Sequence, residues 1–140
     1  MEKNLIAPCG INCGICRGYL AYSKNIPKKR GKISHCIGCR PRNKQCAYLK
    51  GHCENLKNNI IEFCFECKNY PCDRLKHIDE RYRKNFNVSP IENLNNIKRD
   101  GIDKFLEHQE EKYKCSRCGG IICIHNKKCY DCNKVEIWMG

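Results

Sequence analysis

Hydrophobic side chains recur with helical spacing over one long part of the chain, residues 72–113. The first predicted helix covers residues 72–86 and carries an apolar face formed by Leu75, Ile78 and Tyr82. Ser89 followed by Pro90 is a start signal for a second helix, because an N-cap residue precedes proline at the first helical position. This second helix extends to Gly101 with Ile91, Leu94 and Ile97 on one face.

A third helix is predicted from residue 102 to about Tyr113, with an apolar face at Ile102, Phe105, Leu106 and Gln109. Elsewhere the helical patterns are short, at residues 17–25, 45–50 and 54–61. Residues 1–16 read as an irregular segment. The pattern therefore predicts a small, irregular, mostly α protein with little β structure, in which one helical stretch, 73–113, packs on a core of another kind.

Fifteen cysteines supply that other core, and most have the spacing of metal ligands. Two thiolates three residues apart can reach one tetrahedral ion, and this step occurs five times. The candidate ligands are Cys9, Cys13, Cys16, Cys36, Cys39, Cys46, Cys53, Cys64, Cys67, Cys72, Cys115, Cys118, Cys129 and Cys132.

The first residues, MEKNLIAPCGINCG, lack the apolar stretch of a secretory signal, and no later segment has the length and apolarity of a membrane span. We therefore expect a cytoplasmic protein with no membrane partner. In that reducing compartment clustered thiols bind metal rather than form disulfides. The odd number of cysteines also disfavours a complete set of disulfides.

Residues 115–132 contain the most definite motif, two C-x2-C pairs separated by ten residues. Cys118 precedes Gly119 and Cys132 precedes Asn133, residue types that tolerate left-handed backbone. The spacing predicts a zinc-ribbon-like or rubredoxin-like hairpin that brings both pairs to one ion. Cys123 and His125 lie between the pairs and are weaker candidate ligands, and Cys123 could equally be a buried or redox-active thiol.

Composition makes a metal-stabilised fold necessary. The hydrophobic content of 41% includes the cysteines, and without them it falls to about 30%, which is a thin core for 140 residues. We expect a cysteine-rich core over residues 1–113 and a zinc-ribbon-like unit over 114–135 packed on it. The formal charge of +12 would fall to about +6 if three zinc ions bound twelve thiolates, so the charge alone predicts no partner.

Four sequence motifs occur in an order typical of one family: Ala7-Pro8-Cys9-Gly10-Ile11-Asn12-Cys13, Cys36-Ile37-Gly38-Cys39, Tyr70-Pro71-Cys72 after Phe63-Cys64, and Cys115-x2-Cys118-Gly119-Gly120. With them the chain resembles a family of small cysteine-rich bacterial and archaeal proteins, domain of unknown function 3795. The resemblance implies a metal-binding protein, usually described as zinc-binding, with no established activity.

Zinc at about three sites is the favoured interpretation, with an iron–sulfur cluster at the N-terminal cysteines as the alternative. The spacing of Cys9, Cys13 and Cys16 also occurs in radical S-adenosylmethionine enzymes, but the chain lacks the strand–helix alternation of their barrel. No catalytic triad, phosphate-binding glycine loop or dinucleotide motif is present, so no catalytic residue is predicted.

The sequence thus favours a binding or adaptor module with mainly structural metal sites, and a protein partner over RNA or DNA. An iron–sulfur redox protein is the second hypothesis. The third is a nucleic-acid-binding zinc protein that uses the basic residues Lys28–Lys32, Arg40, Arg42, Lys127 and Lys128.

Overall fold

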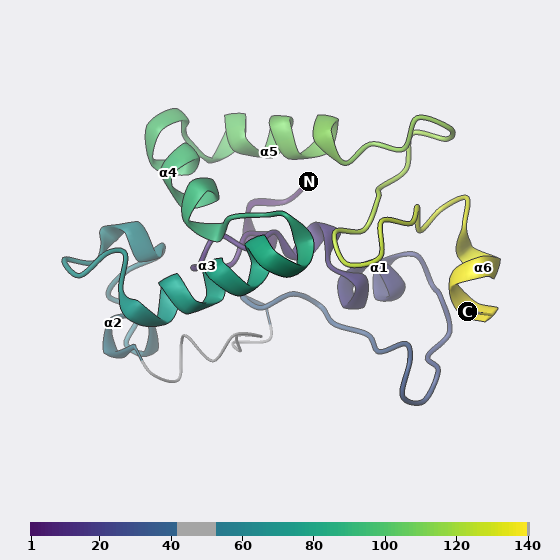
Figure 1. Ribbon diagram of the computed structural model, residues 1–140, viewed down its shortest axis with the longest axis horizontal. Coiled ribbons are helices and arrows are strands. Elements are labelled where there is room, and N and C mark those ends of the chain that lie inside the picture. Colours follow the sequence, from purple (N-terminus) through teal and green to yellow (C-terminus); the bar gives the residue numbers. More distant parts are fainter. Residues whose placement is uncertain (42–52, 140) are drawn as a thin grey trace.

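The computed structural model describes residues 1–41 and 53–139 of the chain. Their helical elements are η1 (Lys3–Leu5), η2 (Cys13–Ile15), α1 (Arg17–Ser23), α2 (Glu54–Lys57), η4 (Cys64–Glu66), α3 (Asp73–Phe86), α4 (Pro90–Asp100), α5 (Ile102–Lys112) and α6 (Lys134–Met139) (Figure 1). These residues form isolated β-bridges but no strand. The mostly helical prediction is confirmed, while the helical pattern at 45–50 lies outside the described residues.

Helices α3, α4 and α5 follow one another and account for most of the helical structure (Figure 1). Their bounds agree closely with the periodicity of the sequence. The Ser89 hydroxyl caps α4 by accepting a 3.1 Å hydrogen bond from the backbone N–H of Glu92, as the Ser-Pro signal predicts. Helix α4 packs against both α3 and α5. None of the helices described is long and apolar enough to cross a membrane.

A buried carboxylate joins the first two helices of this group. Asp79 of α3 is 4% exposed. It accepts hydrogen bonds from the Ser89 hydroxyl at 2.5 Å and from the backbone N–H of Ile91 at 3.0 Å. Arg83 forms an ion pair with it at 2.8 Å, one turn along α3. The side chain therefore fixes the start of α4 against α3.

The helices and the N-terminal cysteines share one hydrophobic core. Leu75 of α3 and Leu94 of α4 are completely buried in it. The same cluster contains the buried cysteines Cys9, Cys13, Cys39 and Cys64. The helical stretch therefore packs against these cysteines in one apolar cluster.

The first cysteine segment fits tightly against α4 and α5. Gly10 has φ 90°, and a Cβ atom on it would lie 2.5 Å from the carbonyl oxygen of Pro90. Asn93 of α4 donates a 2.9 Å hydrogen bond to the Gly10 carbonyl. Next to it, the buried Asn12 side chain donates a 3.1 Å hydrogen bond to Gln109 of α5. Glycine is required at position 10 because backbone from α4 occupies the space of a side chain.

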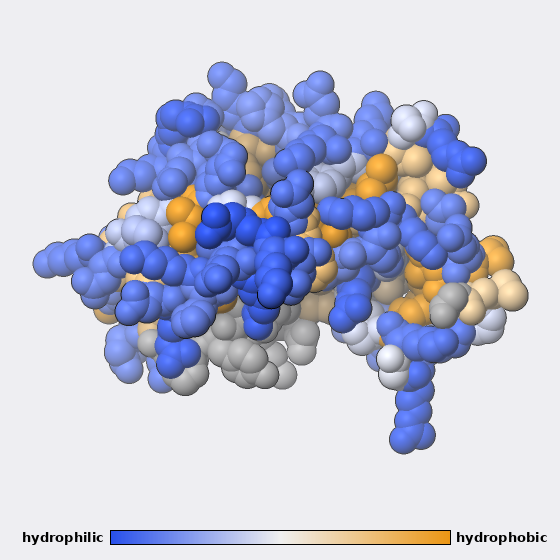
Figure 2. Space-filling view, viewed as in Figure 1, coloured by the Kyte–Doolittle hydropathy of each residue, from blue (hydrophilic) through white to orange (hydrophobic). Residues whose placement is uncertain are grey.

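The segment after α5 returns to the start of α1, at the right of Figure 1. The backbone N–H of Ile124 donates a 3.0 Å hydrogen bond to the carbonyl of Ile15. Here Cys123 and Tyr130 pack in a second apolar cluster with residues of the α1 region, Leu20, Ala21 and Ile26. Hydrophobic surface from this part is visible beside α6 in Figure 2. Helix α6 itself has no counterpart among the predicted elements.

Candidate metal centre

Four cysteine sulfurs converge after α5. Those of Cys115, Cys118, Cys129 and Cys132 all lie within 4.8 Å of one another. Cys115 and Cys129 are buried, whereas Cys118 and Cys132 are exposed. The four belong to the two C-x2-C pairs that the sequence predicts to share one ion. The group can therefore hold a metal ion with ligands from this segment alone.

The distances between sulfurs have the size that a single ion requires. The Sγ atoms of Cys118 and Cys129 are 3.5 Å apart, and those of Cys115 and Cys132 are 3.9 Å apart. Four thiolates at about 2.3 Å from a tetrahedral ion would be separated by about 3.8 Å. In a cubane iron–sulfur cluster each thiolate binds a different iron, which spreads the sulfurs further apart. The spacing therefore fits one ion rather than a cluster.

The first pair is shaped by a tight turn after Cys115. The backbone N–H of Cys115 donates to the carbonyl of Gly120 at 2.7 Å, and its own carbonyl accepts from Gly119 at 2.9 Å. Gly119 has φ 76°, the left-handed backbone that glycine tolerates. The N–H of Gly120 then points to the Cys118 sulfur at 3.4 Å. A donor in this position stabilises a thiolate.

The second pair has a similar amide contact but a different ending. The N–H of Asp131 lies 3.4 Å from the Cys129 sulfur. Asn133 is not among the described residues with positive φ. Its side-chain oxygen instead accepts from the N–H of Cys129 at 3.3 Å and from the Cys132 thiol at 3.7 Å. The left-handed backbone that asparagine tolerates is therefore not used here, because the side chain makes the contacts that close the turn.

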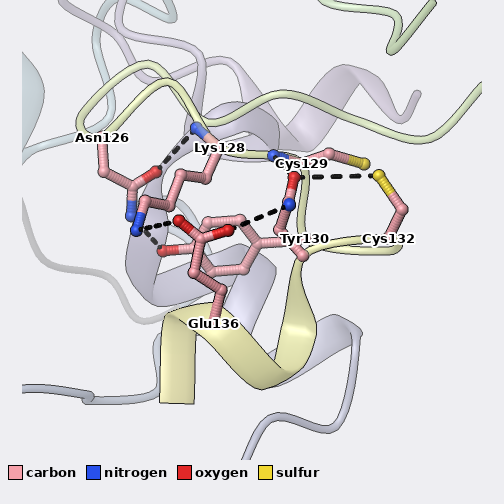
Figure 3. A network of polar contacts seen from close by, with 7 residues as sticks. Asn126, Lys128, Cys129, Tyr130, Cys132 and Glu136 are labelled. Atoms are coloured by element: carbon pink, nitrogen blue, oxygen red, sulfur yellow. Dashed lines mark hydrogen bonds and ion pairs between the residues drawn. The ribbon is translucent and has the colours of Figure 1, made fainter. Parts of the chain in front are cut away.

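An ion pair extends this network to α6. Glu136 forms an ion pair with Lys128 at 3.0 Å (Figure 3). The amide nitrogen of Asn133 donates a 3.2 Å hydrogen bond to Glu136. These residues surround the ligands without being ligands, and the spacing of the cysteines gave no signal for them. The nearest indication in the sequence is the short apolar run Val135, Ile137 and Trp138, which follows Cys132 too closely to be read as a separate helix.

The chain between the two pairs does not form the predicted zinc-ribbon hairpin as a pair of strands. Isolated bridges join Lys114 to Ile121 and Ile122 to Cys129. Inside the second bridge, the N–H of Cys123 donates to the carbonyl of Lys128 at 2.9 Å, and Lys127 has φ 60°. The two bridges suffice to bring the pairs together, but a ribbon is not confirmed.

The thiols of the group differ in acidity. Hydrogen bonds from the backbone N–H groups of Cys118 and Arg117 lower the pKa of Cys115 to about 7. The contact with Cys129 raises the pKa of Cys132 to about 12. A cation would favour ionisation of all four thiols, because a coordinating thiolate must lose its proton. Metal binding to this group would therefore release protons.

Cys123 and His125 lie outside the four-sulfur group. Cys123 is completely buried, and burial raises the pKa of its thiol. Burial, with the charges of Arg17 and Lys127, lowers the pKa of His125 to about 4. The neutral ring accepts a 3.3 Å hydrogen bond at Nδ1 from the backbone N–H of Arg17 and packs edge-on against Phe86. In the structure the pair serves to dock this segment on the N-terminal region.

The first two N-terminal cysteine motifs meet each other. The N–H of Cys39 points to the Cys13 sulfur at 3.5 Å, and the N–H of Cys36 donates to the carbonyl of Gly18 at 3.1 Å. Within the Cys36–Cys39 motif, the N–H of Gly38 lies 3.4 Å from the Cys36 sulfur. This is the same amide-to-sulfur contact that both C-terminal pairs make.

Comparison with known proteins assigns this N-terminal part to a family. The family described as protein of unknown function (DUF3795) matches residues 5–77, just over half of the chain. The chain belongs to the DUF3795 family. Neither the curated proteins nor the solved structures include a significant match. The matched residues contain every cysteine from Cys9 to Cys72, whereas the four-sulfur group lies beyond them.

Within the DUF3795 segment, a further group of cysteines lies near Cys64, apart from the contact between Cys13 and Cys39. The N–H of Cys64 donates to the carbonyl of Pro8 at 3.0 Å, next to Cys9. Burial raises the pKa of the Cys64 thiol, and charges on nearby thiolates raise it further, those of Cys9, Cys72, Cys53 and Cys67. In the described parts of the chain these sulfurs are not as close together as the C-terminal four. Cys46 lies outside the described residues, so ligand assignment here stays a prediction.

Proposed function

We propose that the protein is a zinc-dependent binding module whose metal sites are structural. The observation that carries the proposal is the four-sulfur group, in which two sulfur pairs lie 3.5 and 3.9 Å apart. Zinc bound by four thiolates in a tetrahedron has no open position for a substrate or water. Such an ion stabilises the surrounding fold, and a partner would bind to the protein surface and not to the ion.

The surroundings of the group favour a structural role as well. Apart from the helix α6, the C-terminal segment has isolated bridges and turns, and two of its four ligands are buried. Without an ion, four adjacent thiols would contribute little to holding these turns together. A structural zinc site in a small domain contributes about 10–16 kcal/mol, as much as the stability of a whole domain.

The N-terminal cysteines support two further ions. We assign Cys13, Cys16, Cys36 and Cys39 to one, because the first two motifs meet at the contact between Cys13 and Cys39. The second would use ligands from Cys9, Cys53, Cys64, Cys67 and Cys72, whose mutual charges act on Cys64. The order along the chain instead favours Cys9, Cys13 and Cys16 at one ion and Cys36 and Cys39 at another. The total is about three ions per chain.

Elemental analysis of protein purified without oxygen, together with its absorption spectrum, tests this function. We expect about three zinc ions per chain and no absorption in the visible range. Iron with visible absorption at the N-terminal cysteines would contradict the zinc assignment. It would support the alternative, an iron–sulfur redox protein. A variant that lacks the four C-terminal cysteines gives the metal content of the N-terminal cysteines alone, and the difference from the wild type gives that of the C-terminal group.

A further inference from the structure

A basic groove lies between α1, the loop after it and the turn of the second cysteine pair. Its volume is about 920 Å³. The cations at its wall are Arg17, Lys28, Lys29, Arg30 and Lys32. The described residues that line it include no aspartate or glutamate. The groove therefore concentrates positive charge and selects an anionic ligand.

The loop that carries most of these cations has a defined backbone structure. Lys29 and Ile33 exchange two backbone hydrogen bonds, of 3.0 and 2.8 Å. Gly31 at the tip has φ 75°. In Figure 1 this loop projects below α6, and the corresponding surface in Figure 2 is strongly hydrophilic. Lys28 and Arg30 are exposed on it. The backbone bridge thus holds the charged side chains at the rim of the groove.

Exposed aromatic rings flank the cations on two sides. Trp138 of α6 is 44% exposed, and Lys29 reaches it with Nζ 2.8 Å from its carbonyl and 5.3 Å from the ring centre. On the α1 side, Tyr22 is 47% exposed and meets the ring of His35 edge-on at 6.1 Å. The two rings are 116 positions apart in the sequence, so only the fold places them beside the same basic loop.

We propose that this groove binds single-stranded nucleic acid. Its phosphates would pair with Arg17, Lys28 and Arg30, and its bases would stack on Trp138 and Tyr22. Proteins that bind single strands without sequence preference combine these two features, a basic groove and exposed aromatic rings. A duplex hides the faces of its bases and would gain nothing from the rings. An acidic protein surface would use the cations but gives no reason for an aromatic ring on each side.

The metal centre supports one wall of this groove. Tyr130 lines it and lies between the ligands Cys129 and Cys132, and its hydroxyl accepts a 2.8 Å hydrogen bond from Asn126, another lining residue. The inference rests on the proposed function to this extent: the C-terminal ion holds Tyr130 and α6 in place. It specifies the partner of the binding module and does not depend on which metal is bound.

Fluorescence anisotropy with a labelled twelve-nucleotide oligo(U) RNA and the full-length, metal-loaded protein tests the proposal. The double variant Lys28→Gln/Arg30→Gln should bind more weakly and show a salt dependence of log K shallower by about 1.4, for two lost phosphate contacts. Arg74→Gln/Lys84→Gln removes the same charge from the exposed face of α3 and should bind as the wild type does. Trp138→Ala should lower the affinity between about fivefold and a hundredfold.

Three results would overturn the proposal: equal losses in the two double variants, equal affinity for an RNA duplex, or no effect of Trp138→Ala. Binding to phosphatidylserine vesicles without binding to RNA would also overturn it, in favour of a membrane surface. The metal content of the same samples separates the two hypotheses. RNA binding by protein that holds another metal in place of zinc contradicts the proposed function alone, whereas zinc-loaded protein that does not bind RNA contradicts this inference alone.

Discussion

The imidazole Nδ1 of His125 accepts a 3.3 Å hydrogen bond from the backbone N–H of Arg17, 108 positions earlier in the chain. The neighbouring Ile124 donates from its N–H to the carbonyl of Ile15 at 3.0 Å. Arg17 begins α1 directly after Cys16. The segment between the two C-terminal cysteine pairs is therefore attached to the DUF3795 segment at its first cysteine motif, and the two parts should respond together to changes at this contact.

Replacing His125 by alanine should destabilise the protein by about 1–3 kcal/mol and leave its metal content unchanged. The change removes the acceptor of the exposed Arg17 N–H, worth about 0.5–1.5 kcal/mol, and the edge-on contact with Phe86, worth about as much. Chemical denaturation and elemental analysis would measure both effects. His77→Ala, on the exposed face of α3, is the control and should stay within about 0.5 kcal/mol of the wild type. Loss of one ion in the His125 variant would show instead that the histidine is a ligand.

Gly10→Ala should destabilise the protein more than Gly101→Ala. The two glycines have nearly the same backbone angle, φ 90° and 88°. A Cβ at position 101 meets nothing within 4 Å, whereas one at position 10 meets the Pro90 carbonyl. In both variants, alanine at a positive φ lowers the free energy of unfolding by about 1–2 kcal/mol. Overpacking against α4 lowers it by about 1–3 kcal/mol more in Gly10→Ala. Equal losses in thermal or chemical unfolding would show that α4 does not approach Gly10 closely.

Asp79→Ala should cost about 1.5–3 kcal/mol, because it leaves the Ile91 N–H and the Ser89 hydroxyl without their buried acceptor. Arg83→Ala removes only the ion pair of an exposed side chain and should cost less than about 1 kcal/mol. Urea denaturation of both variants would compare them. A larger loss in the Arg83 variant would contradict the role given to the carboxylate.

The sequence predicted the parts of this structure that depend on local chemistry. The bounds of α3, α4 and α5 follow from apolar period and from the Ser89-Pro90 signal, and the grouping of Cys115 with Cys132 follows from ligand spacing. Contacts between distant segments were not predictable in this way. Cys39 lies beside Cys13, and Trp138 beside Lys29, only because the whole chain folds. Helix α6 was also not predicted. It is linked to Asn133 through Glu136, and side-chain contacts of this kind around the ligands leave no periodic pattern in the sequence.

Chelation of the metal under reducing conditions should unfold residues 115–132 and the cysteine-rich first 72 residues, while residual helix remains in 73–113. The reason is that the non-cysteine core is thin and the turns around the ligands have few other interactions. Circular dichroism and amide exchange before and after chelation would detect the difference. Slow exchange around Cys64 in the metal-free protein would contradict this and would favour a functional role for the N-terminal ions.

The most direct test of the four-sulfur metal site is the metal content of two matched variants. Cys118→Ser/Cys132→Ser alters two exposed members of the group, and Cys123→Ser alters the buried thiol beside it. The account predicts that the first variant binds one ion fewer per chain than the wild type and that the second binds the full number. Unchanged metal in the first variant, or the loss of one ion in the second, would contradict it.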